Sequence, residues 1–568
     1  MFETIKGLGV SDGVGIGELL LVKPDEPALE SKSSNVELES NRLQQALGQS
    51  LSELEDIYES KRETLGEDKA QIFQAHIMIL QDPEWVKDIA GKITDDSWSA
   101  EYAVQLSAEA MAQMFEGMDN PYFQERAHDI RDVARRIIRI LRGEASVDLG
   151  LAKPGSIIAA VDLTPSDTAQ LNAKNIVGII TAVGGKTSHS AIIARTLGIP
   201  AVMGIGRTAF EALAQEQKAI VDGDQGTLTL NPTEQVIVDY KDRINQIELE
   251  KKELQKYIGL ETKTADGKSI ELAANIASPN DLERVLENDA EGIGLFRSEF
   301  LFMDRTSAPT EEEQYESYSA VLKGMTDKPV IIRTMDIGGD KEVSYLNMPE
   351  EMNPFLGYRA IRYCLNEPEV FKIQIRALLR AGVYGKLRIM LPMISSVQEV
   401  RQSKAIIESV KEDLRNENVE FADDVPVGIM IEIPAAAIAS DLLAKEVDFF
   451  SIGTNDLIQY TVAVDRMNES IADLYTAYHP AVLRLIKMTI KNGHEAGIWV
   501  GMCGSVAGDL TLMPLLIGMG LDEFSMSPST ILKARKTTMG IDYKKAQSMV
   551  NDILSLSTAT DIENALSK

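Results

Sequence analysis

One histidine of the chain lies in a glycine-rich turn between an apolar segment and a helical segment. The turn, Gly184–His189, follows the apolar run Val177–Ala182. The two glycines at its start permit positive φ angles, and Thr187 or Ser188 can cap the helix that follows. The unpaired N–H groups and the positive dipole end of a helix N-terminus favour a phosphoryl group carried on an imidazole nitrogen. The pattern therefore suggests His189 as a phosphoryl-accepting nucleophile.

Two other interpretations of this turn have to be weighed. Gly185-Lys186-Thr187 resembles the end of a P-loop, but that motif requires a glycine at position 180, where the chain has Ile180. His189 can also be a structural residue that caps a helix, because the chain has only 5 histidines and a lone histidine is more often structural than catalytic. Lys186 and Arg195 would add positive charge in the catalytic interpretation. On the residues alone, both interpretations of His189 stay open.

Five apolar segments in the C-terminal half of the chain end in polar residues. They are Phe296–Phe300, Ile332–Lys341, Ile431–Pro434, Gly453–Asp456 and Gly501–Gly504. Arg297 and Arg333, leaving adjacent strands, would form a rigid bidentate clamp for phosphate or carboxylate. A single arginine or aspartate at a strand end is usually a surface or ion-pair residue. Five polar ends on five apolar strands are hard to explain in that way, because unpaired charges are costly to bury.

Two of these ends carry carboxylates, Glu432 and Asp456. Carboxylates are hard oxygen ligands that suit Mg²⁺, which binds a couple of them together with water and substrate phosphate oxygens. The sequence has no cluster of histidines and cysteines that would favour a softer metal. Cys503 ends another strand, and a small apolar cysteine beside a barrel is usually a packing residue. The chemistry of Cys503 therefore stays open on the residues alone.

The scaffold for these residues is predicted from a strand-then-helix rhythm that begins near Ala265. Eight such repeats are the number in a (β/α)8 TIM barrel, and catalytic groups of that fold lie at the C-terminal ends of the strands. We assign the barrel to residues 263–568. The predicted strands are Ile270–Ile276, Gly292–Arg297, Val330–Asp336, Leu387–Met393, Val427–Ile433, Phe449–Thr454, Trp499–Cys503 and Glu523–Ser527.

The N-terminal half predicts an α/β domain with helices inserted into it. Short apolar strands occur in residues 1–22, where one or two are expected, and again in residues 145–230. Between them, residues 23–144 are rich in Glu, Gln, Ala, Leu and Lys at helical spacing, which predicts four or five helices. A charged segment, residues 231–262, is expected to be a linker helix. The fold class is therefore α/β and multidomain.

Composition and charge exclude several classes of protein. The 568 residues carry 57 Lys and Arg against 87 Asp and Glu, a net charge of −30, which argues against nucleic-acid binding over a broad basic face. The 2 cysteines cannot form a disulfide framework. No run of eighteen apolar residues occurs, and the start of the sequence lacks a signal-peptide core. We expect a cytoplasmic protein with no membrane insertion.

Taken together, these motifs resemble a known family. Gly184–Arg195 is similar to the phosphohistidine signature shared by enzyme I of the phosphoenolpyruvate:sugar phosphotransferase system, pyruvate phosphate dikinase and phosphoenolpyruvate synthase, and the polar strand ends resemble the same PEP-utilizing enzyme family. The resemblance spans essentially the whole chain. The length and the early helical block point to enzyme I, because the dikinase and the synthase carry a large additional nucleotide-binding domain for which there is no room.

The resemblance implies a role for each matching residue. His189 would be phosphorylated, supported by Thr168 and Arg195, and Cys503 would protonate the enolpyruvate. Glu432 and Asp456 would hold Mg²⁺. The residues implied in phosphoenolpyruvate binding are Arg297, Arg333, Asn455, Asp456, Arg466, Lys341 and Arg359. One departure is Ser505, where the family usually has glutamate after Cys503-Gly504; it puts in doubt how the thiol is tuned.

The resemblance also implies a partner and an assembly. The helical block would dock the phosphocarrier protein HPr through Glu67, Asp68, Lys69, His76, Met78, Asp82 and Glu84. The implied reaction moves a phosphoryl group from phosphoenolpyruvate to His189, releases pyruvate, and passes the group to a histidine of HPr, the first step of sugar uptake. The α/β domain would swivel, and the barrel would form a homodimer. The alternatives are a nucleotide-dependent dikinase or synthase, and a binding protein that has lost catalysis.

Overall fold

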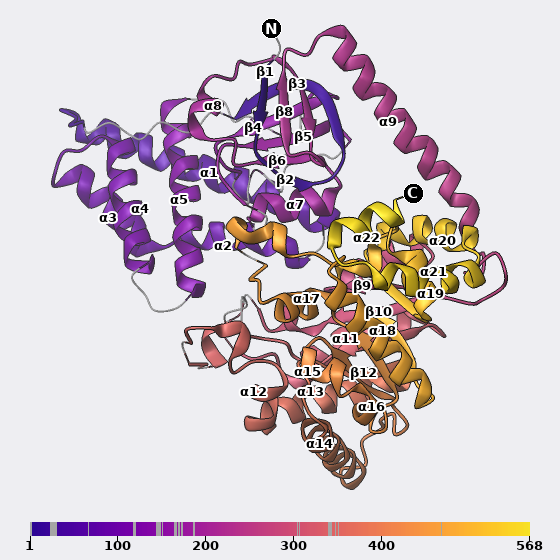
Figure 1. Cartoon of the computed structure of the whole chain (residues 1–568). Coiled ribbons are helices and arrows are strands. Elements are labelled where there is room, and N and C mark those ends of the chain that lie inside the picture. Colours follow the sequence, from indigo (N-terminus) through magenta and orange to yellow (C-terminus); the bar gives the residue numbers. More distant parts are fainter. Residues whose placement is uncertain are drawn as a thin grey trace. The chain divides into compact units, whose positions relative to one another are not determined.

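The computed structural model describes residues 3–22, 31–65, 67–116, 121–143, 149, 152–163, 167, 171, 174–185, 188–303, 305, 307–338, 343–346, 348–349, 351–466 and 468–567 (Figure 1). It has two compact units, one of residues 1–249 and one of residues 250–568. Among the helices it describes, none combines the length and the apolar character needed to span a membrane.

The first unit contains an eight-stranded mixed sheet in the order β1-β8-β7-β3-β4-β5-β6-β2. Its strands are β1 (Glu3–Lys6), β2 (Leu8–Ser11), β3 (Val14–Val22), β4 (Ser156–Ala160), β5 (Ile176–Thr181), β6 (Ala201–Met203), β7 (Lys218–Asp222) and β8 (Thr227–Leu230). Three strands thus precede the helical block, where the sequence predicted one or two. β3 and β4 pair in parallel although the whole helical block separates them in the chain, so the helices form an insertion into this sheet.

Two glycines in β3 allow neighbouring backbone segments to approach closely. A Cβ atom on Gly15 would lie 1.8 Å from the carbonyl oxygen of Val177, and one on Gly17 would lie 2.0 Å from that of Gly155. No side chain fits at either position, so the glycine punctuation of this segment serves close backbone approach.

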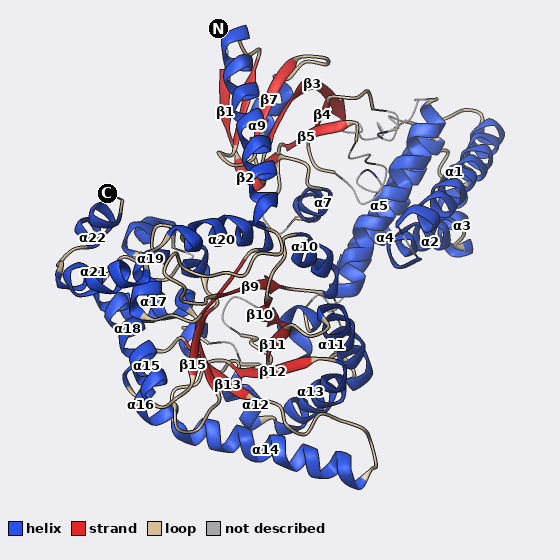
Figure 2. Cartoon of the chain, turned by 90° about the vertical axis from the view of Figure 1, so that its right-hand side faces the viewer, coloured by secondary structure: helices blue, strands red, loops and turns tan. Residues whose placement is uncertain are grey.

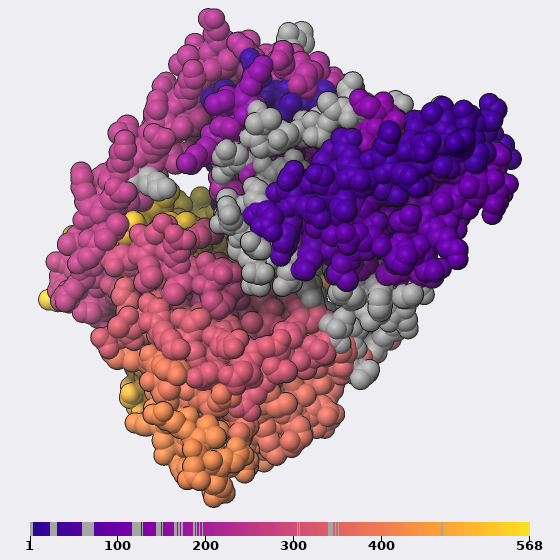
Figure 3. Space-filling view, turned by 180° about the vertical axis from the view of Figure 1, so that it is seen from behind, coloured from indigo at the N-terminus to yellow at the C-terminus, as the bar shows by residue number. Residues whose placement is uncertain are grey.

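The inserted helices form a five-helix bundle: α1 (Val36–Leu65), α2 (Glu67–Leu80), α3 (Pro83–Thr94), α4 (Ala100–Glu116) and α5 (Pro121–Arg142). Their inward faces make one apolar core that includes Trp85, Ile89 and Ile93 of α3. The bundle is the continuous indigo-to-purple mass of the space-filling view (Figure 3). The break between α2 and α3 is sharp because Asp82 caps α3, accepting hydrogen bonds from the backbone nitrogens of Glu84 and Trp85.

Three further helices belong to the α/β part or leave it. They are α7 (His189–Leu197), α8 (Arg207–Glu211) and α9 (Glu234–Leu254). The first half of α9 is tied to the sheet by Arg243, which pairs with Asp222 and Asp224. Its last turn belongs to the second unit, where Lys533 pairs with Glu250 at 3.2 Å.

The second unit is the predicted eight-stranded barrel, and all of its strand pairs are parallel. Its strands are β9 (Glu271–Ile276), β10 (Gly292–Arg297), β11 (Pro329–Arg333), β12 (Lys386–Leu391), β13 (Val427–Ile431), β14 (Phe449–Ile452), β15 (Trp499–Met502) and β16 (Glu523–Met526). Figure 2 shows these strands ringed by helices. The fold predicted from the sequence is confirmed for this part of the chain.

The helices of the second unit range from one turn to about five turns. They are α10 (Leu282–Glu287), α11 (Glu311–Met325), α12 (Ile361–Asn366), α13 (Pro368–Ala381), α14 (Val397–Asn416), α15 (Pro434–Ile438), α16 (Ser440–Leu443), α17 (Thr454–Val462), α18 (Pro480–Glu495), α19 (Met513–Met519), α20 (Ile531–Gly540), α21 (Tyr543–Ser555) and α22 (Ala559–Leu566).

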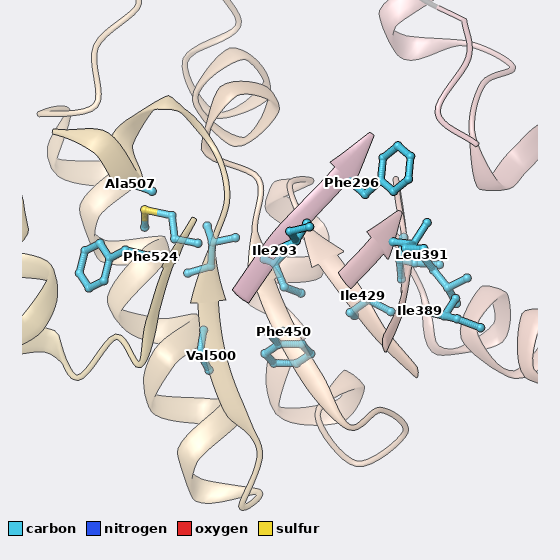
Figure 4. Packing of buried hydrophobic residues seen from close by; sticks show 14 of the residues in the cluster. Ile293, Phe296, Ile389, Leu391, Ile429, Phe450, Val500, Ala507 and Phe524 are labelled. Carbon is cyan, nitrogen blue, oxygen red and sulfur yellow. The ribbon is translucent and has the colours of Figure 1, made fainter. Parts of the chain in front are cut away.

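The barrel strands bury apolar side chains in two layers. Side chains such as Ile389, Ile429 and Phe450 belong to the large core between strands and helices (Figure 4). A separate, smaller cluster packs on the opposite face of the strands, inside the barrel; its members are Leu295, Ile331, Met390, Met430, Phe449 and Cys503. The alternation of the two layers along each strand directs every second residue to the barrel axis.

One buried arginine fastens the start of the barrel domain to its end. Arg535 of α20 is fully buried; its guanidinium donates to Asp289 Oδ2 at 2.6 Å, to the carbonyl of Tyr257 at 2.9 Å and to Thr262 Oγ1 at 3.0 Å. Lys533, on the same helix, pairs with Glu250, and both of these side chains are partly exposed.

We therefore predict that Arg535→Met destabilises the barrel by about 3 kcal/mol, because it leaves buried acceptors without a partner. Lys533→Met is the matched control and should cost less than about 1 kcal/mol, since exposed ion pairs contribute little. Unfolding transitions measured by calorimetry check this. Equal shifts in the two variants would contradict the fastening role of Arg535.

Candidate active site

Two arginines leave neighbouring barrel strands side by side. Arg297 ends β10 and Arg333 ends β11, and the two residues are register partners. Burial lowers the pKa of Arg297, and the nearby charge of Arg333 lowers it further, against the opposite effect of Glu299. Its Nε atom is buried with no hydrogen-bond partner among the described residues. A cation pair held in this way is set up to receive an anion.

Arg333 is held by carboxylates on two sides. Its Nη2 lies 2.5 Å from Glu299 Oε1 and its Nη1 lies 2.9 Å from Asp336 Oδ2. Burial alone would lower the pKa of Arg333, but Glu299 and Asp336 outweigh that effect and raise it. Glu299 and Asp336 were not assigned to the site from the sequence, although both lie inside the polar motifs that end β10 and β11.

The alternation of charges continues across the mouth of the barrel. Asp336 also binds Arg359, with its Oδ1 2.8 Å from Arg359 Nη2. The same Arg359 nitrogen lies 3.5 Å from Asp456 Oδ2, and Asp456 Oδ1 accepts a hydrogen bond from Arg466 Nη1 at 3.0 Å. The structure thus brings together five of the seven residues predicted to bind substrate in one network or next to it: Arg297, Arg333, Arg359, Asp456 and Arg466. Lys341 lies outside the described residues.

The sixth of these residues, Asn455, is held by the serine that departs from the family pattern. Asn455 Oδ1 accepts hydrogen bonds from Ser505 N at 3.0 Å and from Ser505 Oγ at 2.7 Å. The bonds span from the start of α17 to the loop after β15. These bonds fix the orientation of the Asn455 amide, whose NH₂ group is the part that can donate to a bound anion.

The two predicted metal ligands are both buried in the mouth. Glu432 is 2% exposed and accepts a hydrogen bond from the backbone nitrogen of Met393 at 2.6 Å; Asp456 is 6% exposed. Burial raises the pKa of Glu432 to about 8, and the charges of Asp456 and Asp336 add to the effect. Carboxylates that crowd one another in this way fit a divalent cation.

The donor set also indicates what kind of cation fits. In the part of the chain that the structure describes, no group of three or more His, Cys, Asp or Glu side chains is arranged around one metal position. Glu432 and Asp456 would therefore share the ion with water and substrate oxygens. Two hard carboxylates completed by such ligands suit Mg²⁺.

Cys503 lies inside the barrel at the end of β15. It is 4% exposed, and its Sγ lies 3.9 Å from the carbonyl oxygen of Ile452. Burial raises the pKa of the thiol to about 12, against the lowering effects of the Ser451 hydroxyl and of Arg333. Near neutral pH the group is a protonated thiol, which suits a proton donor better than a nucleophile.

The histidine predicted as nucleophile is the first residue of α7. Ser188 caps this helix, accepting a hydrogen bond from Ala191 N at 3.3 Å, and Gly184 supplies the positive φ, 108°, that the preceding turn needs. The side chain of His189 and the whole of Thr168 lie outside the described residues. Arg195 lies in the last turn of α7, where its Nη1 donates to the carbonyl of Val10 at 3.2 Å.

The predicted docking residues divide between surface and interior. Met78 and Glu84 are exposed, and Asp82 is the cap of α3. His76 is 1% exposed; it packs edge-on against Phe73, with Nε2 3.4 Å from Asp129 Oδ1. The structure therefore places His76 inside the bundle and not on the predicted docking surface. The side chains of Glu67, Asp68 and Lys69 lie outside the described residues.

The raised pKa of Glu432 leads to a prediction about metal-free protein. A carboxyl whose pKa is higher in the folded state stabilises the fold below its unfolded pKa, and that contribution is lost as the pH rises through about 8. Between pH 6 and 9 in EDTA, stability should fall by about 3 kcal/mol from this group. Glu432→Gln should reduce the fall, measured by denaturant unfolding at each pH. An unchanged pH dependence in the variant would contradict the assignment.

Comparison with known proteins supports the resemblance seen in the sequence. Three family models match: PEP-utilising enzyme, N-terminal over residues 6–126, PEP-utilising enzyme, mobile domain over 152–226, and PEP-utilising enzyme, PEP-binding domain over 251–543. Proteins named phosphoenolpyruvate-protein phosphotransferase from Priestia megaterium and Staphylococcus carnosus are 49% and 48% identical, each over 99% of this chain and 98% of the relative. One of that name from Listeria innocua is 48% identical over 100% of this chain and 99% of its own. The chain therefore belongs to the PEP-utilising enzyme family.

Proposed function

We propose that this chain is a phosphoenolpyruvate-protein phosphotransferase, which moves a phosphoryl group from phosphoenolpyruvate to His189 and then to a histidine of HPr. The observation that carries the proposal is the pair Arg297 and Arg333 beside the buried carboxylates Glu432 and Asp456 at one end of the barrel. The names and the near full-length identity of the relatives support it. No nucleotide is required.

Phosphoenolpyruvate would be bound by the cations of the barrel mouth. The substrate carries a carboxylate and a phosphate, and two guanidinium groups on adjacent strands match such anions with bidentate hydrogen bonds. Arg359 and Arg466 add charge from the opposite side of the network, and Asn455 adds an amide donor. Lys341 is a further contact implied by the family resemblance. Because strand ends hold the two clamp arginines, the phosphoryl group is aligned before it moves.

Glu432 and Asp456 would hold Mg²⁺ in this site. When bound, the ion supplies positive charge that offsets the charge on the phosphoryl oxygens and on the departing enolate. The crowding of Glu432 by Asp456 and Asp336 supports this assignment, since a bound cation relieves the repulsion among the three carboxylates.

Cys503 would complete the release of pyruvate. Loss of the phosphoryl group leaves an enolate, whose terminal carbon needs a proton to become the methyl group of pyruvate. The buried thiol can give that proton, so that its S–H bond breaks, a C–H bond forms and a thiolate remains. Trapping the enolate as pyruvate favours transfer in the forward direction.

The acceptor histidine and the partner require movement of the N-terminal part. We assign residues 1–22 and 145–230 to a swivelling phosphohistidine domain, 23–144 to HPr docking, 231–262 to the connecting helix and 263–568 to a phosphoenolpyruvate-binding barrel that dimerises. Thr168 and Arg195 would support the phosphorylated ring. His189 begins a helix, so the backbone N–H groups of the first turn can face the transferred phosphoryl group. Such a protein would act in the cytoplasm at the start of sugar uptake.

The first test of this function concerns His189. Labelled phosphoenolpyruvate with Mg²⁺ should give an acid-labile, base-stable phosphoryl label on the wild-type chain, and His189→Ala should lose it entirely, because the accepting nitrogen is gone. Phosphopeptide mapping locates the label. Labelling that persists in His189→Ala would place the acceptor elsewhere.

The second test concerns docking. Glu84→Lys should slow transfer to HPr at least about tenfold while leaving autophosphorylation unchanged, because reversing an exposed charge disturbs encounter with a partner. Glu84 is preferred to Asp82, whose change would also remove a helix cap worth about 1 kcal/mol. The matched control is Asp96→Lys, an exposed reversal beyond the other end of α3. If both steps slow together in Glu84→Lys, or if the control behaves alike, the docking surface is wrong.

A further inference from the structure

Beside the apolar cluster inside the barrel, polar side chains also face the barrel axis near Cys503. TIM barrels usually fill this space with bulky apolar residues. Here the axis holds Glu523 and Ser525 of β16 and Asn275 of β9. Asn275 Nδ2 donates to the carbonyls of Cys503 at 3.1 Å and Ser525 at 3.2 Å, while Ser525 Oγ donates to Asn275 Oδ1 at 2.6 Å. This network joins β16 and β9 to the strand that carries the thiol.

Glu523 is the least expected member of this group. It is 1% exposed, and neither of its carboxyl oxygens has a hydrogen-bond partner among the described residues. Two glycines make room for it: a Cβ atom on Gly294 would lie 2.0 Å from Glu523 Oε1, and one on Gly501 would lie 2.0 Å from Oε2. A buried carboxyl that lacks partners is costly, so its presence calls for an explanation in terms of function.

The position of Glu523 relates it directly to the thiol. Gly501 and Cys503 are two residues apart on β15 and so face the same side, about 7 Å apart along the strand. The carboxyl of Glu523 fills the place of the missing side chain at position 501. Cys503 therefore lies nearer the mouth on the same side of this strand, where the charge of Glu523 raises the pKa of its thiol, and Ser451 is the register partner of Gly501.

Below Glu523, the axis leads to the other end of the barrel. Glu523 and Glu271 are register partners at the starts of β16 and β9. Glu271 is half-buried, as is Arg388 of β12. These are the two charged groups that act on Glu523: burial raises the pKa of Glu523 well above its ordinary value, Glu271 raises it further and Arg388 opposes them. The raised pKa favours the protonated form of the Glu523 carboxyl, and Glu271, its half-buried register partner, is the neighbouring carboxyl at this end of the barrel.

We propose that Glu523 is a positioning and proton-storing residue that returns a proton to Cys503 through the interior of the barrel. The inference rests on the proposed function, in which Cys503 protonates the enolate. After that step the thiolate takes the proton of Glu523: the O–H bond breaks, an S–H bond forms and a carboxylate remains. Glu271 passes a proton from water to that carboxylate. One proton from solvent thereby replaces the one carried away in pyruvate, and no oxidant or reductant is needed.

The test measures proton exchange at the thiol separately from phosphoryl transfer. The full chain with Mg²⁺ and pyruvate in D₂O is followed by proton NMR of the pyruvate methyl group, while single-turnover labelling by phosphoenolpyruvate is measured in parallel. Glu523→Gln, which keeps size and neutral charge, should slow methyl exchange at least about tenfold and leave labelling unchanged. Glu523→Asp should restore part of the exchange. Glu283→Gln, the same change at an exposed carboxyl of α10, is the matched control and should exchange like wild type.

The outcomes separate the relay from the function on which it rests. Exchange at the wild-type rate in Glu523→Gln, or none in the wild type while labelling is normal, overturns the relay and leaves the phosphotransferase intact. Loss of labelling in the wild type refutes the phosphotransferase itself. Exchange lost in Cys503→Ala and slowed in Glu523→Gln supports the relay. If Glu523→Gln does not fold, Glu271→Gln tests the solvent end, and wild-type exchange there overturns the proposal.

Discussion

The structure of the barrel mouth depends on a network of buried and half-buried charges that alternate in sign. Arg333, Asp336, Arg359, Asp456 and Arg466 follow one another as alternating charges across the strand ends. Removing one member would leave its neighbour charged, buried and unpaired, which costs several times more than an exposed ion pair contributes. The network can therefore hold the arginine side chains in place and still leave them able to bind an anion, because a guanidinium has five N–H donors and the carboxylates do not use all of them.

This constraint explains how an acidic chain can present a site for an anion. The net charge of −30 is spread over the sequence, whereas the arginines of the site lie where the protein excludes water and Coulomb interactions are stronger. Burial and Arg333 together lower the pKa of Arg297, so the charged form of Arg297 is the one that a bound anion would stabilise most. Close packing of the loops maintains the geometry: a Cβ atom on Gly504 would lie 1.9 Å from Thr454 Oγ1, so β14 and β15 bring their ends together only with glycine there.

Much of the fold could be predicted from the sequence because barrel strands are apolar runs between helical patterns. The ends of the strands were predicted less accurately. β11 ends at Arg333, whereas the predicted strand ended at Asp336. The backbone nitrogen of Met335 donates to Gln374 Oε1 and so no longer pairs with a neighbouring strand. The paired arginines were predictable from their place after apolar runs. Their partners Glu299 and Asp336 were not predictable. A carboxylate that follows a strand in the sequence is usually a surface residue, and only the three-dimensional arrangement of the strands shows that these two are buried. His76 was assigned to the docking surface only because its segment resembles that of the family, and such a resemblance does not show which helix face a residue lies on; His76 is buried and Met78, two residues on, is exposed.

The inward glutamate shows the limit of such reasoning most clearly. Glu523 begins a strand, where a charged residue is usually a solvated end, and the glycines that make room for it lie on two other strands. No window of the sequence contains all three, so only the closed barrel reveals that the carboxyl points to the axis. The two ends of the barrel then differ in kind: the mouth carries paired charges, and the opposite end buries a carboxyl whose pKa burial raises. Cys503 lies between them, and because burial raises the pKa of its thiol to about 12, a thiolate formed there has a strong tendency to regain a proton.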